Sequence, residues 1–403
     1  MSPRSLLLLA ALTGCSAHRD VGDEPTVVDP AKDGGFTGPL DDGGPTGFDV
    51  IPESALVPGK DNDGDGFPYE EDCNDGDPRI NPGAFEVLGD GVDNDCNGKV
   101  DEDPGECDTP ALKLESENAI DHARALGLCK STTESATGKG KTWGVISAKL
   151  LRADGSGTPN KLQFGILPGF GPNVSPRNGK NVVALSSGTA RTPGQPGFLT
   201  PISPSFQGFN EVAPPPGWPR NTSGCPAPIE NTANDSVSLE LTIRVPTNAK
   251  SFSFDLDFYS SEYIQFVCSE YNDTFVTLLD TKAKLDPKQG GNISFDGKGN
   301  PINVNSGWFE VCSPGTSKGG TSFPCPKGTK ELQGTGFWVD AVPKENGATS
   351  WLRTKAPVVP GETIKVRFQI WDTGDHVLDS TVLLDNWQWQ LAETATPVTD
   401  RPK

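Results

Sequence analysis

Residues 251–260 read Ser-Phe-Ser-Phe-Asp-Leu-Asp-Phe-Tyr-Ser, and every second side chain from Phe252 to Phe258 is apolar. Successive side chains of a β-strand point to opposite faces, so this alternation predicts a strand with one apolar face. The segments 237–245 and 364–370 alternate in the same way. Such alternation is typical of antiparallel sheets that bury one face each. We therefore expect an all-β fold, a two-sheet antiparallel β-sandwich of jelly-roll-like type.

The sandwich is expected over residues 107–392, followed by a disordered tail over 393–403. One helix should interrupt the β pattern, because apolar residues recur at near-helical spacing within 115–130. The segment 153–235 is rich in Gly and Pro, which predicts long loops over the sandwich.

The N-terminus has the pattern of an export signal. Arg4 precedes the apolar run Leu6–Leu12, which is too short to span a bilayer, since that needs about 20 residues. The run ends in LTGC (12–15), which resembles a bacterial lipobox. We therefore expect residues 1–14 to be a lipoprotein signal peptide and a lipid on Cys15 to attach the exported protein to the membrane, at the outer membrane or cell surface. An ordinary signal peptide with a coincidental Cys is the alternative.

The charge of the chain is unevenly distributed. Its 403 residues suit two or three modules and carry a formal net charge of −20, so binding of nucleic acid through the net field is not expected. Residues 15–58, which are rich in Gly, Pro and acidic residues, are expected to form a disordered tether. Residues 59–106 hold 16 Asp and Glu against three Lys and Arg. This acidic block is a candidate for cation binding, and a solvated acidic linker is the alternative.

The cysteines predict disulfide bonds. Nine Cys minus Cys15 leave eight, and an even set in an exported chain implies disulfides. Proximity along the chain is the only guide to their pairing. On that basis the expected pairs are Cys73–Cys96, Cys107–Cys129, Cys225–Cys268 and Cys312–Cys325.

The acidic block opens with DNDGDG (61–66), which has the alternating carboxylates and the turn Gly of a calcium-binding loop. A hard divalent cation takes six to eight oxygens, and alternate residues of a curling loop can all face it. The fit departs from an EF-hand at position 12, where Asp stands in place of Glu. The expected ligands are Asp61, Asp63, Asp65, the carbonyl of Phe67, and Asp72.

A second loop, DNDCNG (93–98), repeats this spacing. Its position 12 is Pro104, so the loop must close earlier. Its expected ligands are Asp93, Asp95, Asn97, Asp101 and Glu102. Asp75 and Asp77 lie between the loops and could complete either site. No amphipathic helix flanks the loops, so a disulfide-tied, loop-rich calcium module is expected rather than an EF-hand pair.

Four motifs make the acidic block similar to the MopE-like metal-binding repeat of bacterial surface proteins. They are DNDGDGF (61–67), EDCND (71–75), DPRINPGA (77–84) and DGVDNDCNG (90–98). The resemblance implies metal binding, and the family takes its name from a copper-binding protein. Copper prefers imidazole or sulfur, however, and none of the three His lies in the block. Calcium is therefore the expected cofactor, with copper as the alternative.

Four further motifs make the sandwich region similar to the choice-of-anchor L domain of bacterial surface proteins. They are DFYSSEY (257–263), FVCSEYNDTF (266–275), IWDTGDH (370–376) and LLDNW (383–387). The resemblance implies an extracellular, anchored module and carries no implication of an activity.

Acidic residues also stand at the expected strand ends of the sandwich, where they could form a second metal site. These residues are Glu262, Glu270, Asp273, Asp372 and Asp385. Paired carboxylates could also serve glycoside hydrolysis, and solvated carboxylates are the third interpretation. Neither His122 nor His376 lies near a nucleophile-elbow motif, and the chain lacks the P-loop, dinucleotide-binding and HExxH motifs, so an enzyme is not expected.

Together these features predict a surface-anchored lipoprotein that binds a divalent metal and has an adhesive or structural binding role outside the cell. Its partner would be an extracellular protein or glycan. The alternatives are a surface-tethered hydrolase acting on polysaccharide or protein, and a copper-binding surface protein.

Overall fold

The computed structural model describes residues 49–102, 112–202, 206, 210–222, 224–225, 232–338 and 346–402. The predicted signal peptide, the lipidation residue Cys15 and the tether up to residue 48 lie outside these residues, as does the end of the acidic block at 103–106.

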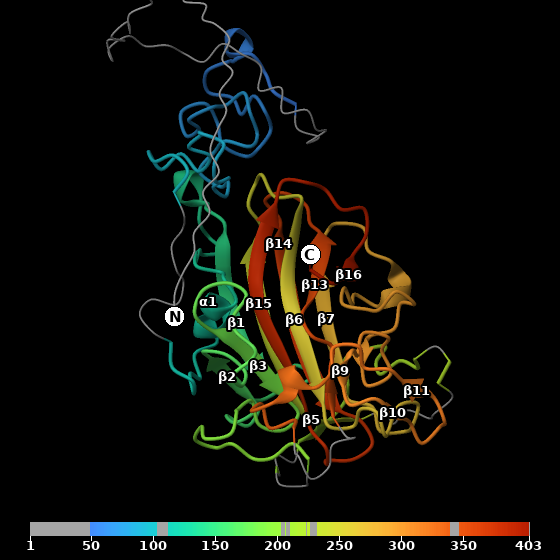
Figure 1. Cartoon of the computed structure of the whole chain (residues 1–403). Coiled ribbons are helices and arrows are strands. Elements are labelled where there is room, and N and C mark those ends of the chain that lie inside the picture. The colour runs from blue at the N-terminus through green and yellow to red at the C-terminus, as the bar shows by residue number, and fades with distance from the viewer. Residues whose placement is uncertain are drawn as a thin grey trace, which may run out of the picture. The chain divides into compact units, whose positions relative to one another are not determined.

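The long strands form two antiparallel sheets that pack face to face (Figure 1). The first sheet has the order β1-β5-β14-β7-β8, with β4 paired to β5. Its strands are β1 (Gly144–Leu151), β4 (Glu211–Val212), β5 (Ala233–Arg244), β7 (Thr274–Asp280), β8 (Ile302–Asn303) and β14 (Thr363–Asp372).

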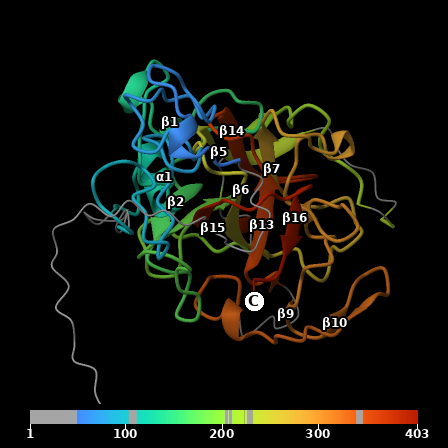
Figure 2. The ribbon, with the colours of Figure 1, turned by 90° about the horizontal axis from the view of Figure 1, so that it is seen from above.

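The second sheet has the order β16-β13-β6-β15-β3-β2, and β12 links β6 to β9 at its margin (Figure 2). Its strands are β2 (Phe164–Leu167), β3 (Val182–Ser186), β6 (Ser251–Ser260), β9 (Val311–Cys312), β12 (Gly347–Ala348), β13 (Leu352–Pro357), β15 (Ser380–Gln390) and β16 (Val398–Asp400). A separate hairpin joins β10 (Gly315–Thr316) to β11 (Ser322–Phe323). The predicted all-β antiparallel sandwich is confirmed.

The core between the sheets is built from the alternating apolar positions. Those of β5, β6 and β14 are fully buried in one cluster, as their pattern predicts. Phe254 of β6 meets Phe368 of β14 edge to face, with ring centroids 5.0 Å apart. Trp387 of β15 stacks on Phe252 at 4.2 Å. Local periodicity therefore identified the inward faces of the central strands.

The outer face of the second sheet is buried as well, which corrects the prediction of one buried face per sheet. Tyr259 of β6 packs there against Phe170 and Phe337, which lie outside the strands. Because these segments cover the face, all ten residues of β6 are buried.

The predicted helix at 115–130 is shorter in the structure, where α1 spans Ala119–Ala125. Asn118 caps its start by accepting a hydrogen bond from the Ile120 N–H at 3.2 Å. Gly127 follows its end with φ +107°, a conformation that favours glycine. The 3₁₀ helices are η1 (Glu53–Ala55), η2 (Gly138–Gly140), η3 (Pro287–Gln289) and η4 (Lys330–Leu332).

Three segments that were predicted to lack regular secondary structure contain helices or strands. The segment 153–235, predicted as loops, contains β2 and β3 beside β15. The predicted disordered tail at 393–403 contains β16, which pairs with β13. The end of the predicted tether, 49–58, includes η1, and Ile51 N–H donates to the Gly76 carbonyl at 2.6 Å. Strands of three to five residues are too short to leave a periodic signal in Gly- and Pro-rich sequence.

Three predicted disulfides are confirmed, namely Cys73–Cys96, Cys225–Cys268 and Cys312–Cys325. Cys129 is also disulfide-bonded, and its predicted partner Cys107 lies outside the described residues. Among the residues that the structure describes, no helix is long and apolar enough to cross a bilayer.

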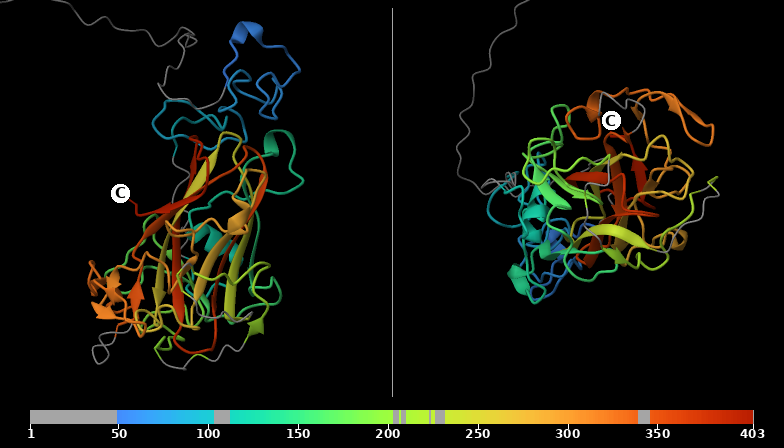
Figure 3. Two further views of the ribbon diagram at one scale, coloured as in Figure 1. Left: turned by 90° about the vertical axis from the view of Figure 1, so that its right-hand side faces the viewer. Right: turned by 90° about the horizontal axis from the view of Figure 1, so that it is seen from below.

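The acidic block packs against the turn between β5 and β6, at one end of the long strands (Figure 3). The fully buried Asn248 accepts from Phe85 N–H and donates to the Phe85 carbonyl, both at 2.9 Å. Thr247 Oγ1 donates to Asn81 Oδ1 at 2.6 Å, and its N–H donates to the Gly83 carbonyl at 3.0 Å. These contacts fix the block to the sandwich.

Candidate metal centres

Carboxylates of the first acidic loop accept hydrogen bonds from backbone N–H groups of the same loop. Asp61 Oδ1 accepts from Gly64 N–H at 2.8 Å. Asp63 Oδ1 and Asp65 Oδ1 each accept from the N–H two residues further on, at 3.2 and 2.9 Å. Asp61 Oδ2 also accepts from Gly66 N–H at 3.0 Å, so both oxygens of Asp61 hold the backbone. The turns at Asp63 and Asp65 occupy one oxygen of each and curl the loop, so that their second oxygens can face one point.

The remaining oxygens of this loop converge. Single oxygens of Asp63, Asp65 and Asp72 lie within 4.8 Å of one another, and Asp61, Asp63 and Asp75 form an overlapping group. Two oxygens bound to one Ca²⁺ are at most about 5 Å apart, since each Ca–O distance is about 2.3–2.6 Å. The Oδ2 atoms of Asp63, Asp65 and Asp72 are buried without a hydrogen-bond partner. The structure thus brings together five of the predicted ligands.

The electrostatics of this group favour a bound cation. Burial raises the pKa of Asp63 to about 7 and that of Asp72 to about 6, and neighbouring carboxylates add to both increases. The pKa of Asp65 is raised as well, first by burial and then by Asp63. The charges that raise these values are all carboxylates, so a positive ion at this point would stabilise the ionised forms.

Two predicted ligands of the first region have other contacts. Asp77 receives two bonds from Arg79, at 2.9 and 2.7 Å, and does not belong to the convergent groups, so its role as a ligand stays a prediction. The Phe67 ring is buried and packs closely over Gly83, where it anchors the loop. Ligation by the Phe67 carbonyl stays a prediction.

The second loop contributes a group that includes an unpredicted residue. Oxygens of Glu86, Asp95 and Glu102 lie within 4.8 Å of one another. Asp95 Oδ1 and Glu102 Oε2 are buried without a hydrogen-bond partner, while Asp95 Oδ2 pairs with Lys130 Nζ at 2.6 Å. Glu86 stands outside the alternating pattern, so no local spacing could have identified it.

The other predicted ligands of the second loop shape its turns. Asp93 accepts from the N–H groups of Asn97 and Gly98, at 3.0 and 2.8 Å. Asp101 Oδ1 accepts from Gly89 N–H at 2.6 Å. The convergent carboxylate group does not include Asp93 or Asp101, whereas Asn97 Nδ2 donates a hydrogen bond to Glu102, a member of that group. Ligation by Asp93, Asn97 and Asp101 stays a prediction.

The donor set consists of oxygen. Asp72 also lies near the sulfurs of Cys73 and Cys96, but these two sulfurs are joined in a disulfide. No His occurs between residues 49 and 102. Carboxylates without imidazole or thiolate suit a hard cation such as Ca²⁺ or Mg²⁺ better than copper.

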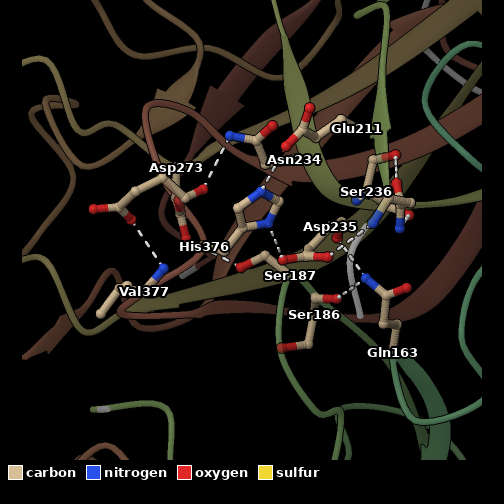
Figure 4. A network of polar contacts seen from close by, with 12 residues as sticks. Gln163, Ser186, Ser187, Glu211, Asn234, Asp235, Ser236, Asp273, His376 and Val377 are labelled. Carbon is tan, nitrogen blue, oxygen red and sulfur yellow. Dashed lines mark hydrogen bonds and ion pairs between the residues drawn. The ribbon is translucent and has the colours of Figure 1, made fainter. Parts of the chain in front are cut away.

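The five acidic residues predicted as a second metal site in the sandwich lie at three different positions in the structure. Glu262, Asp273 and Asp372 come together and are fully buried. Glu270 is exposed, and Asp385 instead accepts hydrogen bonds from the backbone N–H groups of residues 177 and 178. An open cleft lined by four carboxylates, as a hydrolase would use, is therefore not formed by these residues. Figure 4 shows Asp273 with Ser187 and the neighbouring pair of His376 and Asp235.

Comparison with known families places both modules. The model described as "Putative metal-binding motif" matches residues 72–102, which hold Glu86, Asp95 and Glu102. The model described as "Choice-of-anchor L domain" matches residues 180–388, more than half of the chain, and indicates a surface-associated protein. No curated protein and no solved structure matches. The protein is therefore a member of the choice-of-anchor L domain family that carries a metal-binding motif ahead of that domain.

Proposed function

We propose that this protein is a calcium-binding lipoprotein of the cell surface, with an adhesive or structural binding role outside the cell. The observation that supports calcium is the convergence of buried, unpartnered carboxylate oxygens from Asp63, Asp65 and Asp72. A cation compensates buried carboxylates in their ionised form, and this group contains only oxygen donors.

The choice of calcium over other metals rests on ligand type and on the nature of the loop. Copper would lack its preferred nitrogen and sulfur ligands here. Magnesium demands near-ideal octahedral geometry and keeps several waters, whereas calcium accepts the irregular oxygen sets of curling loops.

The role of the ion in this proposal is to hold the acidic block rigid on the sandwich. With calcium bound, the loops that present Phe85 and Asn81 to the β5–β6 turn keep their conformation. Without it, the carboxylates repel one another and the block loosens. A lipid on Cys15 and the tether would then place the sandwich, with its protein or glycan ligand, outside the cell. The protein acts by binding and not by catalysis.

A melting experiment with the exported chain tests the metal. Calcium-depleted protein is heated alone and with Ca²⁺, Mg²⁺ or Cu²⁺ at equal concentration. We expect Ca²⁺ to raise the melting temperature most, because binding to the folded state stabilises it by mass action. A larger increase with Cu²⁺ would establish the copper alternative, and no increase with any metal would refute the proposal.

The anchor is tested separately. Cells that express the full chain are fed a radiolabelled or clickable fatty acid. The wild-type protein should incorporate the label and partition with the membrane, and Cys15→Ser should abolish both. Unlabelled wild-type protein would refute the lipid anchor without affecting the calcium proposal.

A further inference from the structure

Three acidic side chains meet at the end of β6 that is remote from the acidic block. Glu262 follows β6 of the second sheet, while Asp273 precedes β7 and Asp372 ends β14 of the first. Trp371 pairs with Thr274 in the β14–β7 ladder, so Asp372 and Asp273 are neighbours across these strands. Oxygens of the three acids lie within 4.8 Å of one another. The group therefore joins the two sheets.

The three carboxylates are buried and held in place, yet not satisfied. Their residues are at most 1% exposed. Glu262 Oε2 accepts from Asp273 N–H at 3.1 Å. Asp273 Oδ2 accepts from Ser187 Oγ at 3.1 Å (Figure 4). With both acids ionised, Asp273 Oδ1 and Asp372 Oδ1 have no hydrogen-bond donor among the described residues, whereas a proton on one of them would join the two carboxyl groups. Buried acceptors without a protein partner are rare in a core, and a bound cation is one ligand that would satisfy them.

A fourth buried carboxylate, that of Asp379, lies against Gly188 and feels the charge of Asp273. Asp379, which is 5% exposed, has no hydrogen-bond partner for Oδ2. A Cβ on Gly188 would lie 1.9 Å from this oxygen, so only glycine admits it. Gly188 follows Ser187, the donor to Asp273, and Asp273 is the charge that acts most strongly on Asp379.

Neutral oxygens accompany the acids. Ser261 Oγ, Asn272 Oδ1 and Thr373 Oγ1 are each adjacent in sequence to one of the three acids. All three atoms are buried without a hydrogen-bond partner. The charges nearest to Glu262 and Asp372 are other carboxylates, and no Lys or Arg of the described residues pairs with either.

We propose that Glu262, Asp273 and Asp372 bind one divalent cation inside the sandwich, and that this ion is calcium. The separation of the three carboxylate oxygens does not exceed that of two ligands on one Ca²⁺. The ion ties the loop between β6 and β7 to the end of β14. It is independent of the ions proposed for the acidic block.

The test separates the two regions with a variant in which the block no longer binds metal. This block-silent variant carries the substitutions Asp63→Asn, Asp65→Asn, Glu86→Gln and Glu102→Gln. Because a buried ion exchanges slowly, the protein is unfolded in denaturant with chelator, refolded with or without Ca²⁺, and freed of unbound metal by gel filtration. Bound calcium is then measured by elemental analysis, and stability by thermal melting.

We expect one Ca²⁺ per block-silent chain and a higher melting temperature after refolding with calcium. Adding Asp372→Asn should remove the ion, whereas Glu270→Gln, an exposed acid of the same β6–β7 loop, should leave it bound. Terbium offers a second readout: excitation of Trp371, the neighbour of Asp372, should sensitise Tb³⁺ emission, and Trp371→Phe should reduce it.

A block-silent chain with no bound calcium and an unchanged melt would overturn the proposal and leave the acids neutralised by protons. This result needs no substitution among the buried acids, so it holds even if Asp372→Asn fails to fold. If the acidic block does not bind calcium but the sandwich does, the wild-type protein and the block-silent variant will each contain one bound Ca²⁺ per chain.

Discussion

Replacing Asn248 by Ala should release the acidic block from the sandwich. The Asn248 side chain is fully buried, satisfies both the N–H and the carbonyl of Phe85, and also donates to the Arg79 carbonyl at 3.3 Å. Among the described residues, Asn248 is the side chain of the β5–β6 turn that makes more than one hydrogen bond to the block. Its removal therefore tests whether the block is docked or merely adjacent.

Asn248→Ala removes a partner from three backbone groups, and the expected magnitude is taken from the two Phe85 groups, whose hydrogen bonds are the shortest. A buried group left without its partner costs about 1–3 kcal/mol. Phe85 is only half-buried, so water can satisfy part of the loss, and we take about 2–3 kcal/mol for both groups together. That corresponds to an increase of about 30- to 150-fold in the equilibrium constant for local opening, at about 1.4 kcal/mol per factor of ten.

Hydrogen exchange followed by mass spectrometry measures this opening directly. Peptides covering 79–95 should exchange faster in Asn248→Ala, while peptides from β14 keep their wild-type rates and serve as the internal reference. The matched control is Asn160→Ala, since Asn160 is exposed and its side chain accepts only from the N–H of Leu162 in its own turn. Unchanged exchange over 79–95 would refute the docking that we describe.

Three further predictions concern stability. Joint replacement of Cys73 and Cys96 by Ser should destabilise the block by about 3 kcal/mol, judged by its exchange under non-reducing conditions, because the 23-residue separation closes a long loop. Gly83→Ala would place a Cβ 2.9 Å from two side chains of the docking contact and should cost about 1–3 kcal/mol in urea unfolding, whereas Gly140→Ala meets no neighbouring atom and should cost little. Burial lowers the pKa of His122 to about 4, so its neutral form is favoured in the fold and stability is lost as pH falls from about 6.5 to 4. This loss, about 3 kcal/mol at full extent, should be absent in His122→Gln when urea unfolding at pH 7 and pH 4.5 is compared.

Local pattern predicted those parts of the fold that depend on neighbours in sequence. The alternating residues of β5, β6 and β14 are the core because a strand buries every second side chain. The pair Cys312–Cys325 formed because a short separation brings two cysteines together in most folds. Helix α1 ended earlier than its apolar spacing indicated, because Gly127 adopts a positive φ that helices do not continue.

Contacts between segments that are distant in sequence could not be predicted from the local sequence pattern. Asp61, Asp63 and Asp65 were identified because one loop holds them, but Glu86 joins the second group only through the folding of the block. Asp77 matched the spacing equally well and is occupied by Arg79.

The same limit applies inside the sandwich. Glu262, Asp273 and Asp372 are far apart in sequence, and the register of β7 against β14 decides that they meet while Glu270 remains exposed. The sequence did not predict the contact between Gly188 and Asp379, because the need for a glycine at 188 depends on which side chain packs against it in the fold.

The central claim is that the acidic block binds calcium through its unpartnered carboxylates. Calorimetric titration of the calcium-depleted exported chain tests it most directly when two matched variants, Asp65→Asn and Asp77→Asn, are titrated beside the wild type. Each removes one negative charge from the block, but only Asp65 belongs to the convergent group. We predict that Asp77→Asn keeps the wild-type isotherm and that Asp65→Asn loses one binding event. Identical isotherms for the two variants, or no heat in wild type up to about 10 mM Ca²⁺, above the range of extracellular calcium modules, would contradict the account.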